Sequence, residues 1–221
     1  MSDNTPLILS FGSINIDVTA RAARLPRPGE TVHGESYAVV LGGKGSNQAA
    51  AAGRLAAGSG VQVALAGRIG QDGFGIQARQ ELERFGVDLS PLREDAANPT
   101  GIALIGIDES SENCITVVGG ANMAVDETDV SSADEWLRRA KVLLLQLEIP
   151  QLAVLAAARR ARSAGAIVVL APPPAPEHGP PEGLWHEIDL PPPNASENVQ
   201  LSVIRPDNVE VVARAAEVMI T

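Results

Sequence analysis

The chain has 221 residues, of which 45% are hydrophobic and 20% charged, as in a globular protein that buries a sizeable core. Its formal net charge of −10 argues against binding to nucleic acid or to an anionic membrane surface, since both need basic patches. The single cysteine, Cys114, cannot form an internal disulfide, and no apolar run reaches the ~20 residues that span a bilayer. We therefore expect a cytoplasmic protein.

Hydrophobic periodicity predicts strands and helices that alternate along the chain. Two short strands at 101–108 and 113–120, joined by the polar sequence ESSE, predict a hairpin. The proline-crowded stretch at 172–193 predicts an irregular connection. We expect an α/β fold with a mostly parallel sheet, flanking helices and a small antiparallel portion. Further strands are expected at 7–20, 31–41, 61–70, 142–149 and 166–171, and helices at 43–57, 72–87, within 126–141, at 151–164 and at 205–221.

The first polar pair that could carry chemistry lies in the sequence SINID. Side chains two residues apart on a strand share a face, so Asn15 and Asp17 point the same way. Near the carboxyl end of a buried strand, an amide beside a carboxylate could bind the adjacent hydroxyl groups of a polyol. The alternative is that both residues cap a turn.

The glycine cluster GGKGSNQ precedes an alanine-rich helix. Its glycines allow close approach of a ligand and are expected to leave amide N–H groups free at a helix N-terminus. Lys44 would add a cation and Asn47 an amide that both donates and accepts. The cluster is not a P-loop, because Ala38 and Gly45 stand where that motif needs glycine and Ser/Thr. A structural glycine turn is the alternative reading.

Taken together, the motifs form an ordered set: GSINID, PGET, GGKGSNQAAAAGRL, GRIGQDGFG, TGIALI, GGAN, LLLQLEIP and PPPNASE. In order and spacing this set resembles the ribokinase family of carbohydrate kinases, the phosphofructokinase-B group, over nearly the whole chain. The resemblance implies a three-layer α/β domain over 1–221, with lid strands from about 31–41 and 101–118. It also implies ATP-dependent phosphorylation of a small sugar. GGKG together with QLE favours D-ribose, with fructose, adenosine or another nucleoside as alternatives.

Carried over residue by residue, the resemblance implies a sugar site, a nucleotide contact and a metal contact. Asn194 would face the nucleotide phosphates, and Glu197 would help to hold Mg²⁺, largely through water. K⁺ is expected for the family, and a homodimer would form through the lid. The implied sugar contacts are Asn15, Asp17, Gly43, Lys44, Asn47 and Glu148.

The family's Gly-Ala-Gly-Asp element, whose aspartate is the catalytic base, does not occur in the 221 residues. We therefore assign no catalytic residue and expect the C-terminal part of the fold, with most of the K⁺ site, to be missing. A missing general base removes roughly 10²–10⁴-fold of rate enhancement, so we expect little turnover from this chain alone. The alternatives are a sugar-binding relative without catalysis and a fragment of a kinase.

Overall fold

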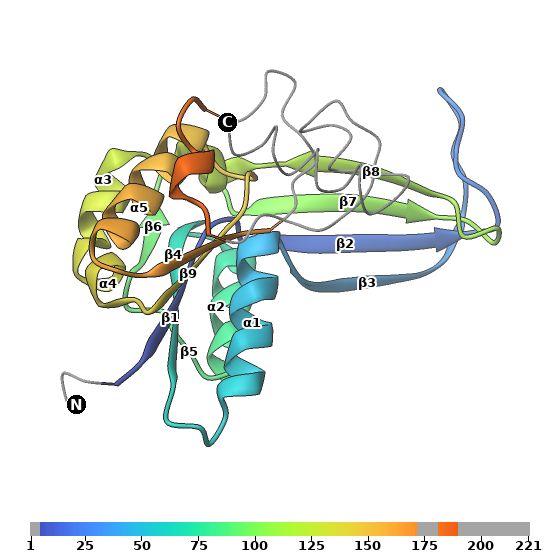
Figure 1. Cartoon of the computed structure of the whole chain (residues 1–221). Helices are drawn as coiled ribbons and strands as arrows, with labels where there is room; N and C mark the ends of the chain where they lie inside the picture. Colours follow the sequence, from blue (N-terminus) through green and yellow to red (C-terminus); the bar gives the residue numbers. More distant parts are fainter. Residues whose placement is uncertain (1–4, 172–180, 190–221) are drawn as a thin grey trace, which may run out of the picture.

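The computed structural model describes residues 5–171 and 181–189, and a parallel sheet forms its centre (Figure 1). The strand order is β10-β9-β1-β4-β5, and β6 pairs with the second half of β4. All of these pairings are parallel, so the carboxyl ends of the strands meet at one edge, where open α/β sheets bind ligands. The strands are β1 (Leu7–Phe11), β4 (Gln62–Gly70), β5 (Val87–Asp88), β6 (Leu92–Asp95), β9 (Val142–Leu145) and β10 (Ile167–Leu170).

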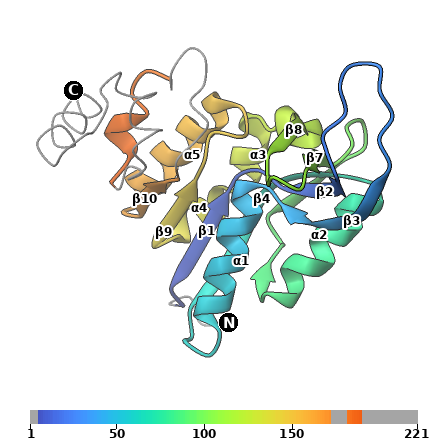
Figure 2. The ribbon, with the colours of Figure 1, turned by 90° about the vertical axis from the view of Figure 1, so that its right-hand side faces the viewer.

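Helices cover both faces of this sheet and give the expected three layers (Figures 1 and 2). On β4, Val63 and Leu65 join the core beneath one pair of helices, whereas Ala64 and Ala66 join the core on the opposite face. Burial on both faces explains why the strands are nearly continuous apolar runs. Within the described ranges, no helix has the length and apolar character needed to cross a bilayer. One face carries α1 (Lys44–Ala56) and α2 (Gly73–Arg84), and the other carries α3 (Glu127–Ser132), α4 (Asp134–Arg139) and α5 (Gln151–Ser163).

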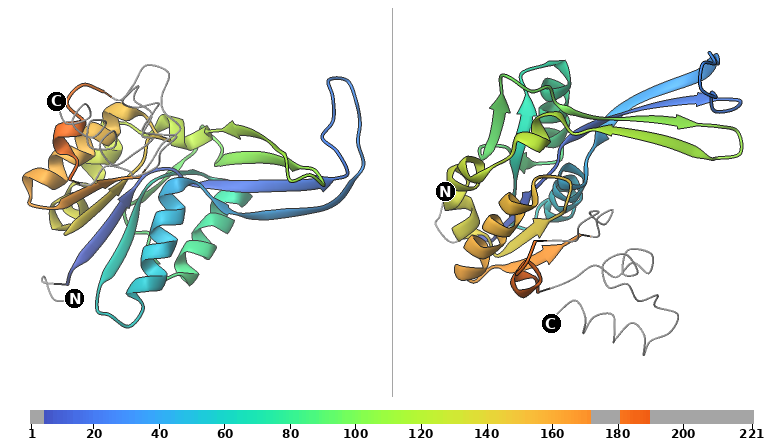
Figure 3. Two further views of the ribbon diagram at one scale, coloured as in Figure 1. Left: turned by 45° about the vertical axis from the view of Figure 1, so that its right-hand side comes forward. Right: turned by 90° about the horizontal axis from the view of Figure 1, so that it is seen from above.

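A second sheet of four strands, called the small sheet below, extends away from the helices (Figures 1 and 3). Its order is β3-β2-β7-β8, with β2 antiparallel to β3 and parallel to β7, and with β7 and β8 forming the predicted hairpin. The sequence therefore predicted the existence of this sheet but missed the central strand, β2. The strands are β2 (Asn15–Ala22), β3 (Gly34–Gly42), β7 (Gly101–Ile107) and β8 (Asn113–Val118).

The chain passes from the main sheet to the small sheet through the turn 12–14. The prediction of one strand over 7–20 is thus wrong, because β1 ends at Phe11 and β2 begins in the other sheet. A β-carbon on Gly12 would lie 1.7 Å from Oε1 of Gln146, so the side-chain amide of Gln146 packs directly against this turn and would have to move for any other residue. Apolar residues continue on both sides of the turn, and the hydrophobic pattern therefore hides the break.

Three shorter segments also differ from expectation. The single short helix predicted within 126–141 is two helices that meet at Ala133. The strands β5 and β6 were not predicted, since two and four residues carry little periodicity. In the proline-crowded stretch only 181–189 is described; there η2 (Trp185–Glu187) forms a 3₁₀ turn and Leu184 is buried in the core. The helix predicted at 205–221 lies outside the described residues.

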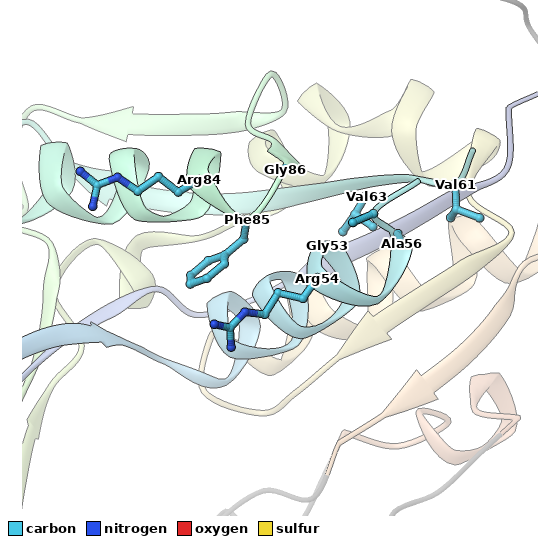
Figure 4. A pocket seen from close by; sticks show the side chains of 9 residues that line it. Gly53, Arg54, Ala56, Val61, Val63, Arg84, Phe85 and Gly86 are labelled. Carbon is cyan, nitrogen blue, oxygen red and sulfur yellow. The ribbon is translucent and has the colours of Figure 1, made fainter. Parts of the chain in front are cut away.

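A glycine lets the C-terminal ends of α1 and α2 touch. A β-carbon on Gly53 would lie 2.3 Å from the carbonyl oxygen of Phe85, which follows α2. Beside this contact lies a cavity of about 620 Å³ between the two helix ends and β4 (Figure 4). The Arg54 guanidinium lies over the Phe85 ring, 4.8 Å from its centroid. Arg54 and Arg84 occupy the last turns of their helices, where positive charge offsets the helix dipole, and this accounts for both arginines.

We expect Gly53→Ala to lower the free energy of unfolding by about 1–3 kcal/mol, because the facing carbonyl is backbone and cannot move without separating the helices. Gly73→Ala is the matched control: a β-carbon there meets nothing within 4 Å, so the change should be neutral or slightly stabilising. Urea denaturation measures both variants. A Gly53→Ala chain as stable as the unmodified one would contradict the close contact.

Candidate functional site

The carboxylate of Glu148 joins three separate segments at the carboxyl edge of the main sheet. Its Oε2 accepts hydrogen bonds from Ser13 Oγ at 2.6 Å and from the backbone N–H of Lys44 at 3.0 Å. Ser13 lies in the turn between the two sheets, and Lys44 is the first residue of α1. The N-cap residue of α1, Gly43, has no side chain to cap the helix, so Glu148 supplies the negative charge that a helix N-terminus favours.

The amides at the start of α1 are already used within the protein. Besides Lys44, the N–H of Gly45 donates to Ser13 Oγ at 3.3 Å, and the N–H of Ser46 donates to the Ser13 carbonyl at 3.0 Å. The N–H of Asn47 donates to the carbonyl of Gly43 at 2.9 Å. The expectation that the glycine cluster leaves these amides free for a ligand is therefore wrong. Those of Gly45 and Ser46 hold α1 against the turn between the sheets, and that of Asn47 begins the helix.

The glycines of the cluster allow close approach between backbone segments. Gly43 has a φ of +89°, and a β-carbon there would lie 2.7 Å from the backbone nitrogen of Asn15. A β-carbon on Gly42 would lie 2.1 Å from Oδ1 of Asp17, so this carboxylate lies directly against the Gly42 backbone. A larger residue at position 42 would displace the carboxylate of Asp17, and one at position 43 would push the start of α1 away from the backbone of the turn and of β2.

The two carboxylates of the site influence each other electrostatically. Partial burial raises the pKa of Asp17, and the negative charge of Glu148 raises it further. Asp17 belongs to β2 of the small sheet, whereas Glu148 follows β9 of the main sheet. The prediction had placed Asp17 near the end of the strand 7–20 and Glu148 at the end of the strand 142–149; Asp17 instead lies near the start of β2, and Glu148 lies in the segment between β9 and α5. Ionised carboxylates only accept hydrogen bonds, so the pair suits a ligand with several hydroxyl groups.

Sequence reasoning missed the residue that holds Asn15. Asn122, in the 3₁₀ helix η1 (Gly120–Ala124), is 1% exposed, and its Nδ2 donates to Oδ1 of Asn15 at 2.8 Å. The same side chain pairs with the backbone of Ile14, accepting from its N–H and donating to its carbonyl, both at 2.9 Å. Asn122 belongs to the GGAN motif, and a polar residue after two glycines was the only signal of its role.

The remaining predicted residues are distributed unevenly. Asn15, Asp17, Gly43, Lys44 and Glu148 lie together around the start of α1. The side chain of Asn47 is exposed on the first turn of α1, and no hydrogen bond within the described ranges joins it to the other five. Asn194 and Glu197 lie outside the described residues. Among those that are described, no group of three or more His, Cys, Asp or Glu side chains is arranged to hold a metal ion.

Comparisons with known proteins agree on one family. Residues 5–221 match the family described as pfkB family carbohydrate kinase. The chain is 36% identical to ribokinase from Schizosaccharomyces pombe over 170 residues, covering 76% of this chain and 54% of that protein. It is 35% identical to ribokinase from Haemophilus influenzae over 208 residues, covering 94% of this chain and 66% of that protein. The chain thus spans about half to two thirds of the length of these curated relatives.

A solved structure shows the same fold. The Arabidopsis thaliana ribokinase complexed with ribose and ATP superposes with a TM-score of 0.81 at 30% sequence identity. The match covers 97% of this chain and 69% of that structure. The three-layer fold with its small sheet is therefore a ribokinase-type fold.

The raised pKa of Asp17 has a consequence for stability. The native state holds the Asp17 proton more tightly than the unfolded state does, so stability falls as pH rises from the ordinary aspartate value through the raised one. Asparagine does not titrate, so Asp17→Asn removes this loss of stability with rising pH. The free energy of unfolding at pH 7 minus that at pH 4 should therefore be more positive in the variant than in the unmodified chain. Urea denaturation at the two pH values measures the difference. The same pH dependence in both proteins would show that Asp17 is not perturbed.

Proposed function

The chain belongs to the pfkB family of carbohydrate kinases, and from this premise we propose that it binds a small sugar, D-ribose above others, as the acceptor of a phosphoryl group from ATP. The observation that carries the proposal is the convergence of Asp17 and Glu148 with the amide of Asn15 at the start of α1. Gly43, Lys44 and Asn47 complete the proposed sugar contacts. Phosphoryl transfer depends on positioning and charge neutralisation, and this arrangement serves the positioning.

The relatives favour ribose as the acceptor, and the polar groups of the site favour a ligand with neighbouring hydroxyls. The curated relatives at 35–36% identity are ribokinases from a fungus and a bacterium, and the solved relative holds ribose together with ATP. The carboxylates, which accept hydrogen bonds, and the amide, which also donates them, are complementary to neighbouring hydroxyls that do both. Fructose and adenosine are the competing ligands, and both offer adjacent hydroxyl groups as well.

In this proposal the small sheet acts as a lid over the sugar. Asn15 and Asp17 begin β2, so the same strand carries sugar contacts and forms the centre of the lid. A lid excludes water, which would otherwise compete with the sugar hydroxyl as the acceptor of the phosphoryl group. The sugar therefore binds between the start of α1 and the face of the small sheet that carries Asp17.

The nucleotide and metal contacts remain proposals from the sequence. We propose that Asn194 faces the ATP phosphates and that Glu197 helps to hold Mg²⁺ through water; K⁺ is expected for the full-length family, and most of its site would lie in the part of the fold that we expect to be missing here. Bound Mg²⁺ neutralises charge on the phosphates during transfer. We also propose a cytoplasmic location, where Cys114, exposed on β8, remains a free thiol.

Calorimetry with D-ribose tests the proposed site. The unmodified chain should bind ribose more tightly than fructose or adenosine. Asp17→Asn should weaken ribose binding about 10- to 100-fold, because it removes a charged acceptor of hydroxyl hydrogen bonds. Glu109→Gln, which changes an exposed carboxylate between β7 and β8, is the control and should leave binding unchanged. Ribose binding that survives Asp17→Asn would refute the site.

We further propose that two copies of the chain pair through the small sheet. The strand register places Asp17, Val40, Ala103 and Val117 in one row on one face. Among the described residues, the two ends of this row are apolar and exposed, since Val40 is 48% and Val117 61% exposed. Isolated exposed apolar residues are common, but a row on the open face of a sheet favours a partner surface. A second copy would offer the same row, as two-fold symmetry requires.

Sedimentation velocity tests this dimer. Val117→Asp should convert a dimeric sample to monomers, because a buried carboxylate without a partner is costly at an apolar interface. Thr116→Asp is the matched control, since Thr116 is also exposed on β8 but points to the opposite face. Dissociation by both substitutions, or by neither, would contradict an interface on the face of Asp17.

A further inference from the structure

The buried amide of Asn122 has a fixed orientation. Its Oδ1 accepts from the backbone N–H of Ile14, and its Nδ2 donates to the carbonyl of the same residue, both at 2.9 Å. A flipped amide would place donor against donor and acceptor against acceptor at 1% exposure, where no water could compensate. The backbone of Ile14 therefore determines which end of Asn122 is the donor.

This orientation is passed on to Asn15. The second hydrogen of Asn122 Nδ2 points to the Asn15 side chain at 2.8 Å, so the Asn15 atom that receives it must be Oδ1. The two amides pack directly against Gly101, where a β-carbon would lie 2.2 Å from Oδ1 of Asn15 and 2.3 Å from Nδ2 of Asn122. Asn15, 7% exposed, then keeps Nδ2 as its remaining polar group, and no described residue accepts a hydrogen bond from it.

We propose that Asn122 is a positioning residue that makes Asn15 a hydrogen-bond donor toward the sugar. The inference rests on the proposed function, because it states, for that same site, which partner donates to the sugar hydroxyls and which accepts from them. Asn15 Nδ2 donates to a hydroxyl oxygen, and the hydrogens of the hydroxyl groups go to carboxylates such as Asp17. A deoxy carbon or a protonated amine at that position would leave the Asn15 donor unmatched, so Asn122 contributes to selection of the ligand.

Asn122→Asp tests the assignment with an isosteric change. An aspartate at position 122 can accept from Ile14 but cannot donate, so Asn15 would rotate its amide to donate to it and present Oδ1 to the sugar. The expected result is ribose affinity reduced about tenfold or more, measured by calorimetry on the full chain. Urea denaturation of the same samples reports separately any loss of stability from the bond to the Ile14 carbonyl.

A double-mutant cycle with Asn15→Ala separates positioning from general support of the fold. If Asn122 acts through Asn15, then Asn122→Asp should cost little further ribose affinity once Asn15 is alanine. Equal losses in both backgrounds would show a merely structural role and overturn the inference. So would unchanged ribose affinity in Asn122→Asp alone.

Asn15→Asp provides a second test that leaves Asn122 intact, and it decides the matter if the Asn122 variant does not fold. One carboxylate oxygen still accepts from Asn122, while the other replaces the donor with an acceptor. Ribose affinity should fall about tenfold or more, and retained affinity would overturn the inference. Absence of ribose binding by the unmodified chain would instead overturn the proposed function, and this inference with it.

Discussion

The whole site depends on the carboxylate of Glu148 at the N-terminus of α1. It accepts from Ser13 in the turn between the sheets and from the first amide of the helix, so a single charge joins the main sheet, the small sheet and α1. Hydrogen bonds to an ionised group are among the stronger ones in proteins, and here they replace the missing side-chain cap of the helix. Every other residue of the candidate site is positioned relative to this junction.

Glycines leave the space that this junction needs, and the buried amide of Asn122 determines which end of the Asn15 amide is the hydrogen-bond donor. Gly42 and Gly43 bring β3 and α1 against β2, and a β-carbon at either would meet atoms of the site at less than 3 Å. Asn122 then fixes one end of Asn15 against the backbone of the turn. The glycine motif therefore allows β3 and α1 to pack closely against β2, and side chains from elsewhere in the chain supply most of the polar groups of the site.

The sequence predicted the alternation of strands and helices and the small sheet, because periodicity and motifs are local properties. The residues Asn15, Asp17 and Glu148, which the family resemblance implies as sugar contacts, lie close together in the structure. The sequence did not predict the break after Phe11, since apolar residues continue across the turn that changes sheets. It also predicted free amides for a ligand at the start of α1, whereas these amides donate to Ser13, Glu148 and Gly43, of which Glu148 lies 104 positions from Lys44. The role of Asn122 was invisible for the same reason.

The two carboxylates of the site belong to different sheets, Asp17 to the small one and Glu148 to the segment after β9. Partial burial raises the pKa of Asp17, and the negative charge of Glu148 raises it further, so ionisation of Asp17 is disfavoured beside Glu148. A ligand whose hydroxyl groups donate a hydrogen bond to each carboxylate would offset this repulsion. Such a ligand would connect the small sheet to the segment after β9, and its binding would favour one relative position of the two sheets.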